Sequence, residues 1–247
     1  MSPSNPARPF RPFPGNGLAV IVGASGGIGA ALVRALPEAE LAEGGFSAIV
    51  SLSRAGDPPL DLLSETSIAA AAARLEASGA PLRLVVDATG FLHGDGHMPE
   101  RSLREIDPDH LARAFAINAI GPALLAKHFL PLFPREGKAV FATLSARVGS
   151  IADNRLGGWH AYRASKAALN QIVRTAAVEL ARRRPEAVCV AVHPGTVDTA
   201  LSAPFARTGL EVRTPTEAAR RILALIGTLG PGDNGTFLDT AGHSVPW

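Results

Sequence analysis

Cysteine is almost missing from this chain: Cys189 is the single one among 247 residues. One thiol excludes a disulfide within the chain, and this composition is typical of proteins kept in a reducing compartment. The residues around it, 187–192, are all apolar, which predicts an apolar strand carrying a buried structural thiol. We therefore expect a cytoplasmic protein.

Long apolar runs are missing as well. A membrane-spanning helix needs about 20 consecutive apolar residues, and no stretch of the sequence approaches this length. Residues 1–17 are rich in proline and arginine and lack the apolar segment of a secretory signal, which predicts a flexible tail. Its Pro9-x-x-Pro12 motif could dock a partner, but a solvated linker is the more common meaning. We expect no membrane partner.

The charges form no basic patch. The chain has 24 Lys and Arg against 22 Asp and Glu, and no basic run is interleaved with aromatic residues, so nucleic acid is not an expected partner. The one cluster, residues 182–184, stands before Pro185, where a helix should end. Cations at a helix C-terminus complement the helix dipole, which explains the cluster without a ligand.

Tyrosine and lysine are scarce, and two of them are paired. Tyr162 is the only tyrosine, and Lys166, one of three lysines, follows four positions later in a stretch with helical composition. This spacing places the phenol and the ammonium on one helix face. An ammonium stabilises the phenolate and so lowers a pKa that is otherwise about 10, which allows proton transfer near neutral pH. The alternative is an ordinary surface pair on an amphipathic helix.

A glycine turn joins an apolar strand, residues 18–22, to a helix, residues 30–36. Strand, glycine turn and helix begin a βαβ unit, in which glycines let a diphosphate approach the helix N-terminus. The same turn also contains the G-x-S-x-G pattern of α/β-hydrolases, with Ser25 as nucleophile. Because that pattern normally follows several strands and only one precedes it here, we prefer the dinucleotide interpretation; a tight turn without a ligand is the third.

Strand-like and helix-like segments alternate along the rest of the chain, which predicts an α/β protein with a mostly parallel sheet. The length is that of one large domain, residues 18–247. A helix begins at Asp107 and contains Pro122, another begins at Thr214, and residues 201–213 have the weak periodicity of a mobile lid. The further expected strands are 46–54, 59–63, 82–86, 137–144, 187–192 and 235–239, and the further helices are 66–78 and 159–184.

Two segments bear on ligands. Arg54 ends the second strand, where many dinucleotide folds have an acid that binds the ribose 2′-hydroxyl, and an arginine suits a 2′-phosphate instead. This predicts a preference for NADP(H), with NAD(H) as the alternative. His93 and His97 flank a Gly-Asp-Gly loop with metal-ligand residue types, but no fourth ligand is in view, so we expect a solvated loop and no metal.

These features together resemble the short-chain dehydrogenase/reductase family, and within it the C-factor-like branch through residues 145–150 and 245–247. The match runs from about Leu18 to the C-terminus. The specific part is the resemblance to the catalytic tetrad, carried by Asn118, Ser145, Tyr162 and Lys166. The weaker parts resemble the cofactor turn (Gly23, Gly27, Ile28, Gly29), the adenine-contacting acid (Asp61) and the turn beside the nicotinamide (Pro194, Gly195).

The resemblance implies a three-layer, doubly wound Rossmann fold with about seven mostly parallel strands. It implies an NADP(H)-dependent oxidoreductase that passes hydride between nicotinamide and a small-molecule carbonyl or alcohol substrate. Tyr162 would transfer the proton, Ser145 would hold the carbonyl oxygen, and Lys166 would bind the nicotinamide ribose and lower the tyrosine pKa. A homodimer or homotetramer is also implied. The implied cofactor contacts are Gly23, Ser25, Gly27, Ile28, Gly29, Arg54, Asp61, Ala88, Gly90, Tyr162, Lys166, Pro194, Gly195, Val197 and Thr199.

The sequence departs from the family pattern in two places. The usual Asn-Asn-Ala-Gly is replaced by Asp87-Ala88-Thr89-Gly90, and Val22 replaces the usual threonine before the glycine turn. Both lie in structural parts of the cofactor pocket. The alternative function is a dinucleotide-binding signalling or scaffold protein with little turnover; the intact tetrad argues against it, because a pure binder has no need of Tyr162.

Overall fold

The centre of the computed structural model, which describes residues 8–94, 96–205 and 211–247, is a six-stranded sheet. Its strand order is β2-β1-β3-β4-β5-β8, and every pairing is parallel. The strands are β1 (Leu18–Val22), β2 (Ala48–Leu52), β3 (Leu82–Asp87), β4 (Ala139–Leu144), β5 (Ala187–His193) and β8 (Phe237–Asp239).

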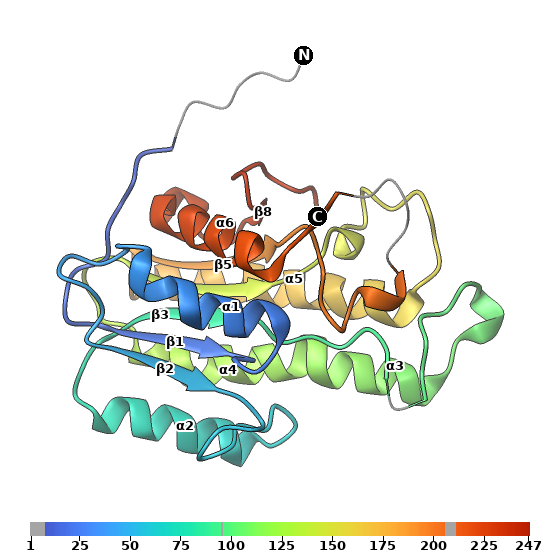
Figure 1. Cartoon of the computed structure of the whole chain (residues 1–247), viewed down its shortest axis with the longest axis horizontal. Helices are drawn as coiled ribbons and strands as arrows, with labels where there is room; N and C mark the ends of the chain where they lie inside the picture. Colours follow the sequence, from blue (N-terminus) through green and yellow to red (C-terminus); the bar gives the residue numbers. More distant parts are fainter. Residues whose placement is uncertain (1–7, 95, 206–210) are drawn as a thin grey trace.

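Helices cover both faces of the sheet (Figure 1). One layer contains α2 (Glu65–Ala77), α4 (Gly121–Phe129) and α5 (His160–Ala181), and the other contains α1 (Gly27–Ala35) and α6 (Pro215–Thr228). Alternate side chains of β1 enter opposite layers: Val20 and Val22 pack with the first, Ala19 and Ile21 with the second. Burial on both faces explains the unbroken apolar runs, and the predicted three-layer, doubly wound fold is confirmed.

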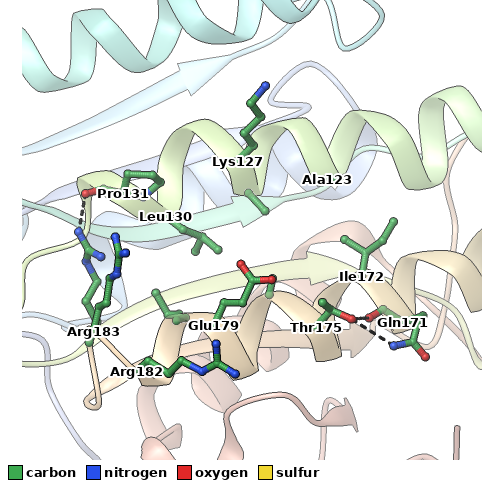
Figure 2. A pocket seen from close by; sticks show the side chains of 14 residues that line it. Ala123, Lys127, Leu130, Pro131, Gln171, Ile172, Thr175, Glu179, Arg182 and Arg183 are labelled. Carbon is green, nitrogen blue, oxygen red and sulfur yellow. Dashed lines mark hydrogen bonds between the residues drawn. The ribbon is translucent and has the colours of Figure 1, made fainter.

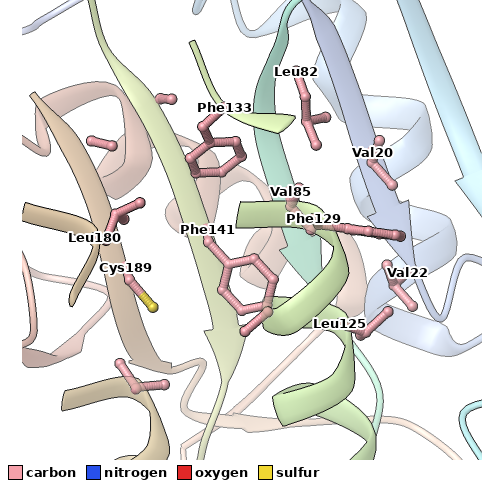
Figure 3. Packing of buried hydrophobic residues seen from close by; sticks show 14 of the residues in the cluster. Val20, Val22, Leu82, Val85, Leu125, Phe129, Phe133, Phe141, Leu180 and Cys189 are labelled. Atoms are coloured by element: carbon pink, nitrogen blue, oxygen red, sulfur yellow. The ribbon is translucent and has the colours of Figure 1, made fainter. Parts of the chain in front are cut away.

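The core beneath α4 and α5 is rich in phenylalanine (Figure 3). Phe129, Phe133 and Phe141 are at most 2% exposed. Cys189 lies in the same cluster, where burial raises the pKa of its thiol to about 12. The predicted strand and the predicted burial of the thiol are both confirmed.

The predicted strand at residues 59–63 is wrong. These residues form turns between β2 and α2, and Ser64 caps α2 by accepting a hydrogen bond from Ser67 N at 3.3 Å. Pro58 and Pro59 have no N–H to donate to a sheet, which explains the difference. A small parallel pair, β6 (Thr196–Val197) with β7 (Val212–Arg213), was not expected; of the predicted lid, residues 206–210 lie outside the described residues.

The predicted flexible tail is wrong for residues 8–17, because this segment packs on the fold. Phe13 is fully buried, and its N–H donates to Leu41 O at 2.7 Å. Arg11 N donates to Gly227 O at 2.8 Å, and the Lys138 ammonium lies 4.6 Å from the centroid of the Phe13 ring. The buried Phe13 ring holds this segment on the fold despite its proline-rich composition. Residues 1–7 lie outside the described part of the chain.

The helix predicted from Asp107 is interrupted. It consists of α3 (Pro108–Phe115), a π-helical turn (Ala116–Ile120) and α4, and the Gly121 N–H bonds to Ala116 O, five residues back. Pro122 has no N–H, so an unbroken α-helical ladder cannot pass through it.

This helical stretch also bears on membranes. Among the described residues, Pro108–Leu132 is long and apolar enough to cross a membrane by length and composition alone, which corrects the expectation that no stretch approaches a span. Leu125 and Phe129 are fully buried in the core beside the sheet, which favours a core helix. The absence of a membrane partner stays a prediction.

Candidate active site

The predicted site residues gather at the carboxyl ends of the strands. The chain leaves β1 for β2 on one side and then crosses back to β3 on the other side, so the sheet has a topological switch point between β1 and β3. Ligands of open α/β sheets bind in the crevice outside the strand ends at such a point. The glycine turn follows β1, Asp87 ends β3, Ser145 follows β4, and Pro194 follows β5.

The glycine turn is shaped for close approach. Gly23 has a φ of +80°, and a Cβ on Gly29 would collide with the carbonyl oxygen of Gly23. The N-cap residue of α1 is Gly26, which has no side chain to cap the helix, and no acidic residue lies in the first turn. The free N–H groups and the positive end of the helix dipole fit a dinucleotide diphosphate.

The end of β2 lies beside this turn. Gly23 N and Ala24 N both donate to Leu52 O, at 2.8 and 3.2 Å, so Arg54 follows two residues after an anchored strand end. Arg54 is exposed and available for a ligand. Asp61 is also exposed, and its Oδ1 accepts the Leu63 N–H at 3.0 Å.

The turn after β5 meets the glycine turn from the other side. Gly195 has a φ of +85°, and a Cβ on Gly27 would lie 2.7 Å from Thr199 Cγ2. Val197 is buried at 4% exposure. Ala88 contacts Gly23: a Cβ on the glycine would lie 3.0 Å from the Ala88 carbonyl. The predicted cofactor residues from three strand ends thus form one cradle.

Tyr162 and Lys166 lie side by side in the first turns of α5, and both are buried. The Lys166 ammonium is 6.0 Å from the centroid of the Tyr162 ring and donates to Leu144 O at 2.8 Å. Burial raises the pKa of Tyr162 to about 12 and lowers the pKa of Lys166 to about 8, while the Asp87 carboxylate opposes the lowering at Lys166. The surface-pair alternative is therefore wrong.

The direction of the tyrosine pKa is opposite to the prediction for the chain by itself. A lysine with a pKa near 8 has lost its proton before a phenol with a pKa near 12 begins to ionise. In the chain alone Lys166 is then neutral and cannot stabilise the phenolate. Burial therefore sets the direction of the shift in the Tyr162 pKa. A positive charge that does not titrate in this range would reverse that direction.

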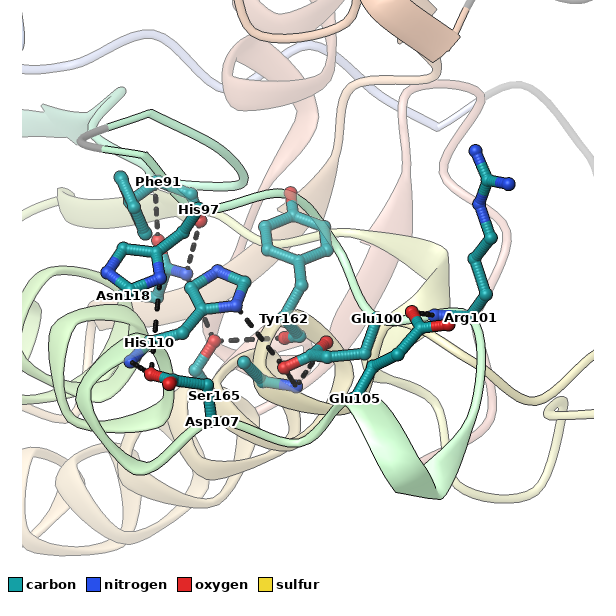
Figure 4. Close-up of polar contacts among 11 residues, drawn as sticks. Phe91, His97, Glu100, Arg101, Glu105, Asp107, His110, Asn118, Tyr162 and Ser165 are labelled. Carbon is teal, nitrogen blue, oxygen red and sulfur yellow. Dashed lines mark hydrogen bonds and ion pairs between the residues drawn. The ribbon is translucent and has the colours of Figure 1, made fainter.

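Asn118 lies in the π-helical turn, and its side chain is fully engaged (Figure 4). Its Nδ2 donates to Phe91 O at 2.7 Å and to Ser165 Oγ at 3.0 Å, and its Oδ1 accepts the Phe91 N–H at 2.7 Å. Ser165 Oγ donates in turn to Tyr162 O at 2.9 Å. Asn118 thus links the loop after β3 to the tyrosine helix.

Ser145 is buried at 3% exposure, directly after β4. Its N–H donates to Val192 O at 2.8 Å, and its hydroxyl donates to Asn170 Oδ1 at 2.7 Å. A Cβ on Gly90 would lie 3.8 Å from Asn118 Oδ1 and 3.9 Å from Lys166 Nζ, so this glycine adjoins the same site. The structure brings all four predicted tetrad residues to one edge of the sheet.

Asp87, which departs from the family pattern, is held by hydrogen bonds from two threonines. Asp87 is fully buried; its Oδ1 accepts from Thr89 N and Thr89 Oγ1 at 3.1 and 2.6 Å, and its Oδ2 accepts from Thr143 Oγ1 at 2.7 Å. Three donors stabilise a buried carboxylate. Its charge also favours the protonated form of Lys166.

Sequence reasoning missed Glu100, which caps the tyrosine helix from outside. The helix begins after Trp159, a left-handed residue whose side chain makes no cap. Glu100 is 2% exposed, and its two carboxylate oxygens lie 3.3 and 3.2 Å from Ala161 N, one residue before Tyr162 (Figure 4). His110 Nδ1 lies 3.3 Å from the same carboxylate. No local pattern could reveal this cap, because 61 residues separate Glu100 from Ala161.

The two histidines of the glycine loop turn to different partners. His93 Nε2 lies 3.1 Å from Leu201 O, whereas His97 stacks on His110 with ring centroids 4.9 Å apart. Within the described residues, no group of three or more His, Cys, Asp or Glu could hold a metal ion; Asp95 lies outside them.

A groove of about 820 Å³ lies away from these residues, on the outer faces of α4 and α5 (Figure 2). It is lined by Leu130, Ile172 and Ala176 among others, and none of the tetrad residues lines it. Arg182 and Arg183 also border it just after α5 ends at Ala181, as the helix-end interpretation of this cluster predicts.

Comparison with known proteins agrees with this geometry. Residues 29–223 match the family model described as enoyl-(acyl carrier protein) reductase. The chain is 39% identical over 147 residues to C-signal of Myxococcus xanthus, covering 59% of this chain and 84% of that protein. It is 31% identical over 191 residues to a 1-hydroxy-2-glutathionyl-2-methyl-3-butene dehydrogenase of Rhodococcus, covering 77% and 80%.

Among solved structures, the NADPH-bound carbonyl reductase from chicken fatty liver superposes with a TM-score of 0.79. It is 25% identical to this chain, and the match covers 94% of this chain and 99% of that one.

Proposed function

The chain belongs to the short-chain dehydrogenase/reductase family and is an NAD(P)-dependent oxidoreductase; from this membership we propose that Tyr162 is the acid and base of a hydride transfer between NADP(H) and a carbonyl or alcohol substrate. The observation that carries this proposal is the assembly of Asn118, Ser145, Tyr162 and Lys166 beside the glycine cradle. The membership also removes support for a hydrolase with Ser25 as nucleophile.

Tyr162, Ser145 and Lys166 divide the work of proton transfer. Bound nicotinamide supplies or accepts the hydride. Tyr162, a neutral phenol at pH 7 because its pKa is about 12, donates its proton to the oxygen of a carbonyl under reduction. Ser145 holds that oxygen by a hydrogen bond. Lys166, still protonated at pH 7 with a pKa of about 8, binds the nicotinamide ribose and favours the phenolate that remains.

NADP(H) is the proposed cofactor. Arg54 is exposed beside the glycine cradle and would pair with the 2′-phosphate, a group that NAD(H) lacks. The diphosphate would lie on the N-terminus of α1. Proposed contacts around them are Gly23, Ser25, Gly27, Ile28, Gly29, Asp61, Ala88, Gly90, Pro194, Gly195, Val197 and Thr199.

A panel of carbonyl compounds tests the proposal. The chain is mixed with NADPH and, in turn, with 2,3-butanedione, isatin, 4-nitrobenzaldehyde and ethyl acetoacetate, and absorbance is followed at 340 nm. At least one compound should be reduced, and Tyr162→Phe should retain NADPH binding but lose turnover. Equal turnover by Tyr162→Phe would reject Tyr162 as the proton donor.

The likeness to C-signal keeps a second candidate, a dinucleotide-binding signalling protein with little turnover. This candidate predicts that NADPH binds while no compound of the panel is reduced. It also predicts that Tyr162→Phe changes no measurable property of the protein except tyrosine absorbance.

Three further properties stay predictions: a cytoplasmic location, the absence of nucleic-acid and membrane partners, and a homodimer or homotetramer. Light scattering on a size-exclusion column measures the last of these directly.

A further inference from the structure

Asn170 is a buried amide on the helix face that carries Tyr162 and Lys166. The three residues follow one another at intervals of four along α5, and Asn170 is 3% exposed. Its Oδ1 accepts a hydrogen bond from Ser145 Oγ at 2.7 Å, and its Nδ2 lies 3.4 Å from Gly149 O. One side chain therefore binds both ends of the segment 145–149.

This segment is pressed against α5. A Cβ on Gly149 would lie 2.8 Å from Lys166 Cβ and 2.9 Å from the Lys166 carbonyl carbon, so only a glycine fits there. At the other end, Ser145 N is held by Val192 O. The backbone of Ser145 is thus fixed by β5, and its hydroxyl is fixed by Asn170.

The direction of the Ser145 hydrogen bond has a chemical consequence. A serine hydroxyl has one proton and two lone pairs, and here the proton is directed at Asn170. Ser145 can then accept a hydrogen bond from the Tyr162 phenol or from an alcohol. To donate to a carbonyl oxygen, it must turn its proton away from Asn170.

We propose that Asn170 is a positioning residue for Ser145, fixing the rotamer of its hydroxyl and holding its proton until a carbonyl oxygen arrives. The proposal rests on the proposed function, in which Ser145 holds the substrate oxygen. The Asn170 side chain makes two hydrogen bonds of different length, 2.7 Å to the Ser145 hydroxyl and 3.4 Å to Gly149 O. The shorter bond goes to the hydroxyl that would hold the substrate oxygen, and the longer one to the loop backbone.

A double-mutant cycle tests whether Asn170 acts through Ser145. Loss of one buried hydrogen bond corresponds to roughly tenfold in rate, so Asn170→Ala should lower kcat/KM about tenfold for whichever panel carbonyl is reduced fastest. In the Ser145→Ala background the same change should lower it less than twofold, because the group that it positions is gone. NADPH affinity, measured by fluorescence, should be unchanged.

Gln171→Ala is the matched control, since Gln171 is the next residue on α5, is exposed, and hydrogen-bonds within the helix to Thr175. It should leave kcat/KM unchanged. Asn170→Asp keeps an acceptor for the Ser145 hydroxyl and should recover part of the lost rate; it replaces Asn170→Ala in the cycle if the alanine variant does not fold. An equal loss in both Ser145 backgrounds overturns the proposal.

Amide hydrogen exchange provides a readout that needs no substrate. In Asn170→Ala, a peptide covering residues 145–150 should exchange several times faster than in the unsubstituted chain, and in Gln171→Ala it should not. Unchanged exchange in Asn170→Ala overturns the proposal whether or not the chain turns over a carbonyl. Failure of the unsubstituted chain to reduce any panel compound rejects the proposed function instead, and exchange then still decides for or against Asn170.

Discussion

The ionisation of Tyr162 should depend on bound cofactor. Burial raises the pKa of this phenol to about 12, which is a cost of roughly 3 kcal/mol to the phenolate relative to an ordinary tyrosine. A charged Lys166, 6.0 Å from the ring centroid, would contribute an amount of the same order, roughly 3 kcal/mol, at an effective dielectric constant of about 20. With a pKa of about 8, however, Lys166 is neutral when the free phenol titrates.

Oxidised nicotinamide carries a positive charge that does not titrate in this range. With NADP⁺ bound we therefore expect the phenol to ionise below pH 10; the phenolate so formed favours the protonated form of Lys166, which then adds its own contribution. In the chain alone no phenolate should form below about pH 11. Lys166→Met should leave the titration of the free chain unchanged and should weaken the effect of NADP⁺.

The assay is simple because Tyr162 is the only tyrosine in the chain. Absorbance at 295 nm reports its phenolate, once the signal of Tyr162→Phe at each pH is subtracted. The same titration is run with and without saturating NADP⁺. A midpoint at or above pH 10 with NADP⁺ bound, or a midpoint below pH 10 in the free chain, would refute this reasoning.

Three more predictions concern neighbouring residues. Arg54→Asp should weaken NADPH binding about ten- to hundredfold while leaving NADH binding unchanged or stronger, since one charge-assisted contact is lost; equal affinities of the unsubstituted chain for the two cofactors would contradict the role of Arg54. Pro122→Ala should lower kcat with little change in cofactor affinity, because its new N–H would compete for the Asn118 carbonyl, which we expect to hold a water that passes protons to Lys166; an unchanged kcat across pH would reject this. Glu100→Ala should lower the free energy of unfolding in urea by about 2–4 kcal/mol, because it leaves buried donors unpaired, and Glu100→Gln should lose less; equal losses in the two variants would argue against the cap.

Local patterns predicted most of the fold. The six strands of the sheet were expected near their observed places, because strands buried on both faces are written as apolar runs. The helix starts predicted at Asp107 and Thr214 are also confirmed. Asp107 accepts the His110 N–H, and Thr214 forms a capping box with Glu217. The false strand at residues 59–63 was predicted from apolar composition alone, without regard to Pro58 just before it and Pro59 at its first position.

Contacts between distant residues could not be predicted in this way. Glu100 caps a helix 61 residues away. Phe13 packs in the core beside α1 and α6, although its neighbours in sequence are both prolines. Asn170 left a faint signal, since it continues the spacing of four from Tyr162 to Lys166. The tyrosine pKa had the wrong sign for the chain alone because the pairing with Lys166 is visible in the sequence, whereas burial is a property of the folded chain.

Isotope transfer tests the central claim most directly. The chain is given NADPH carrying deuterium at the transferred position of C4, together with the panel carbonyl that it reduces fastest, and the alcohol is examined by mass spectrometry. The account predicts one deuterium on the carbinol carbon of the product, and no labelled alcohol from Tyr162→Phe under the same conditions. An alcohol without deuterium, or a labelled alcohol formed equally fast by Tyr162→Phe, would contradict it.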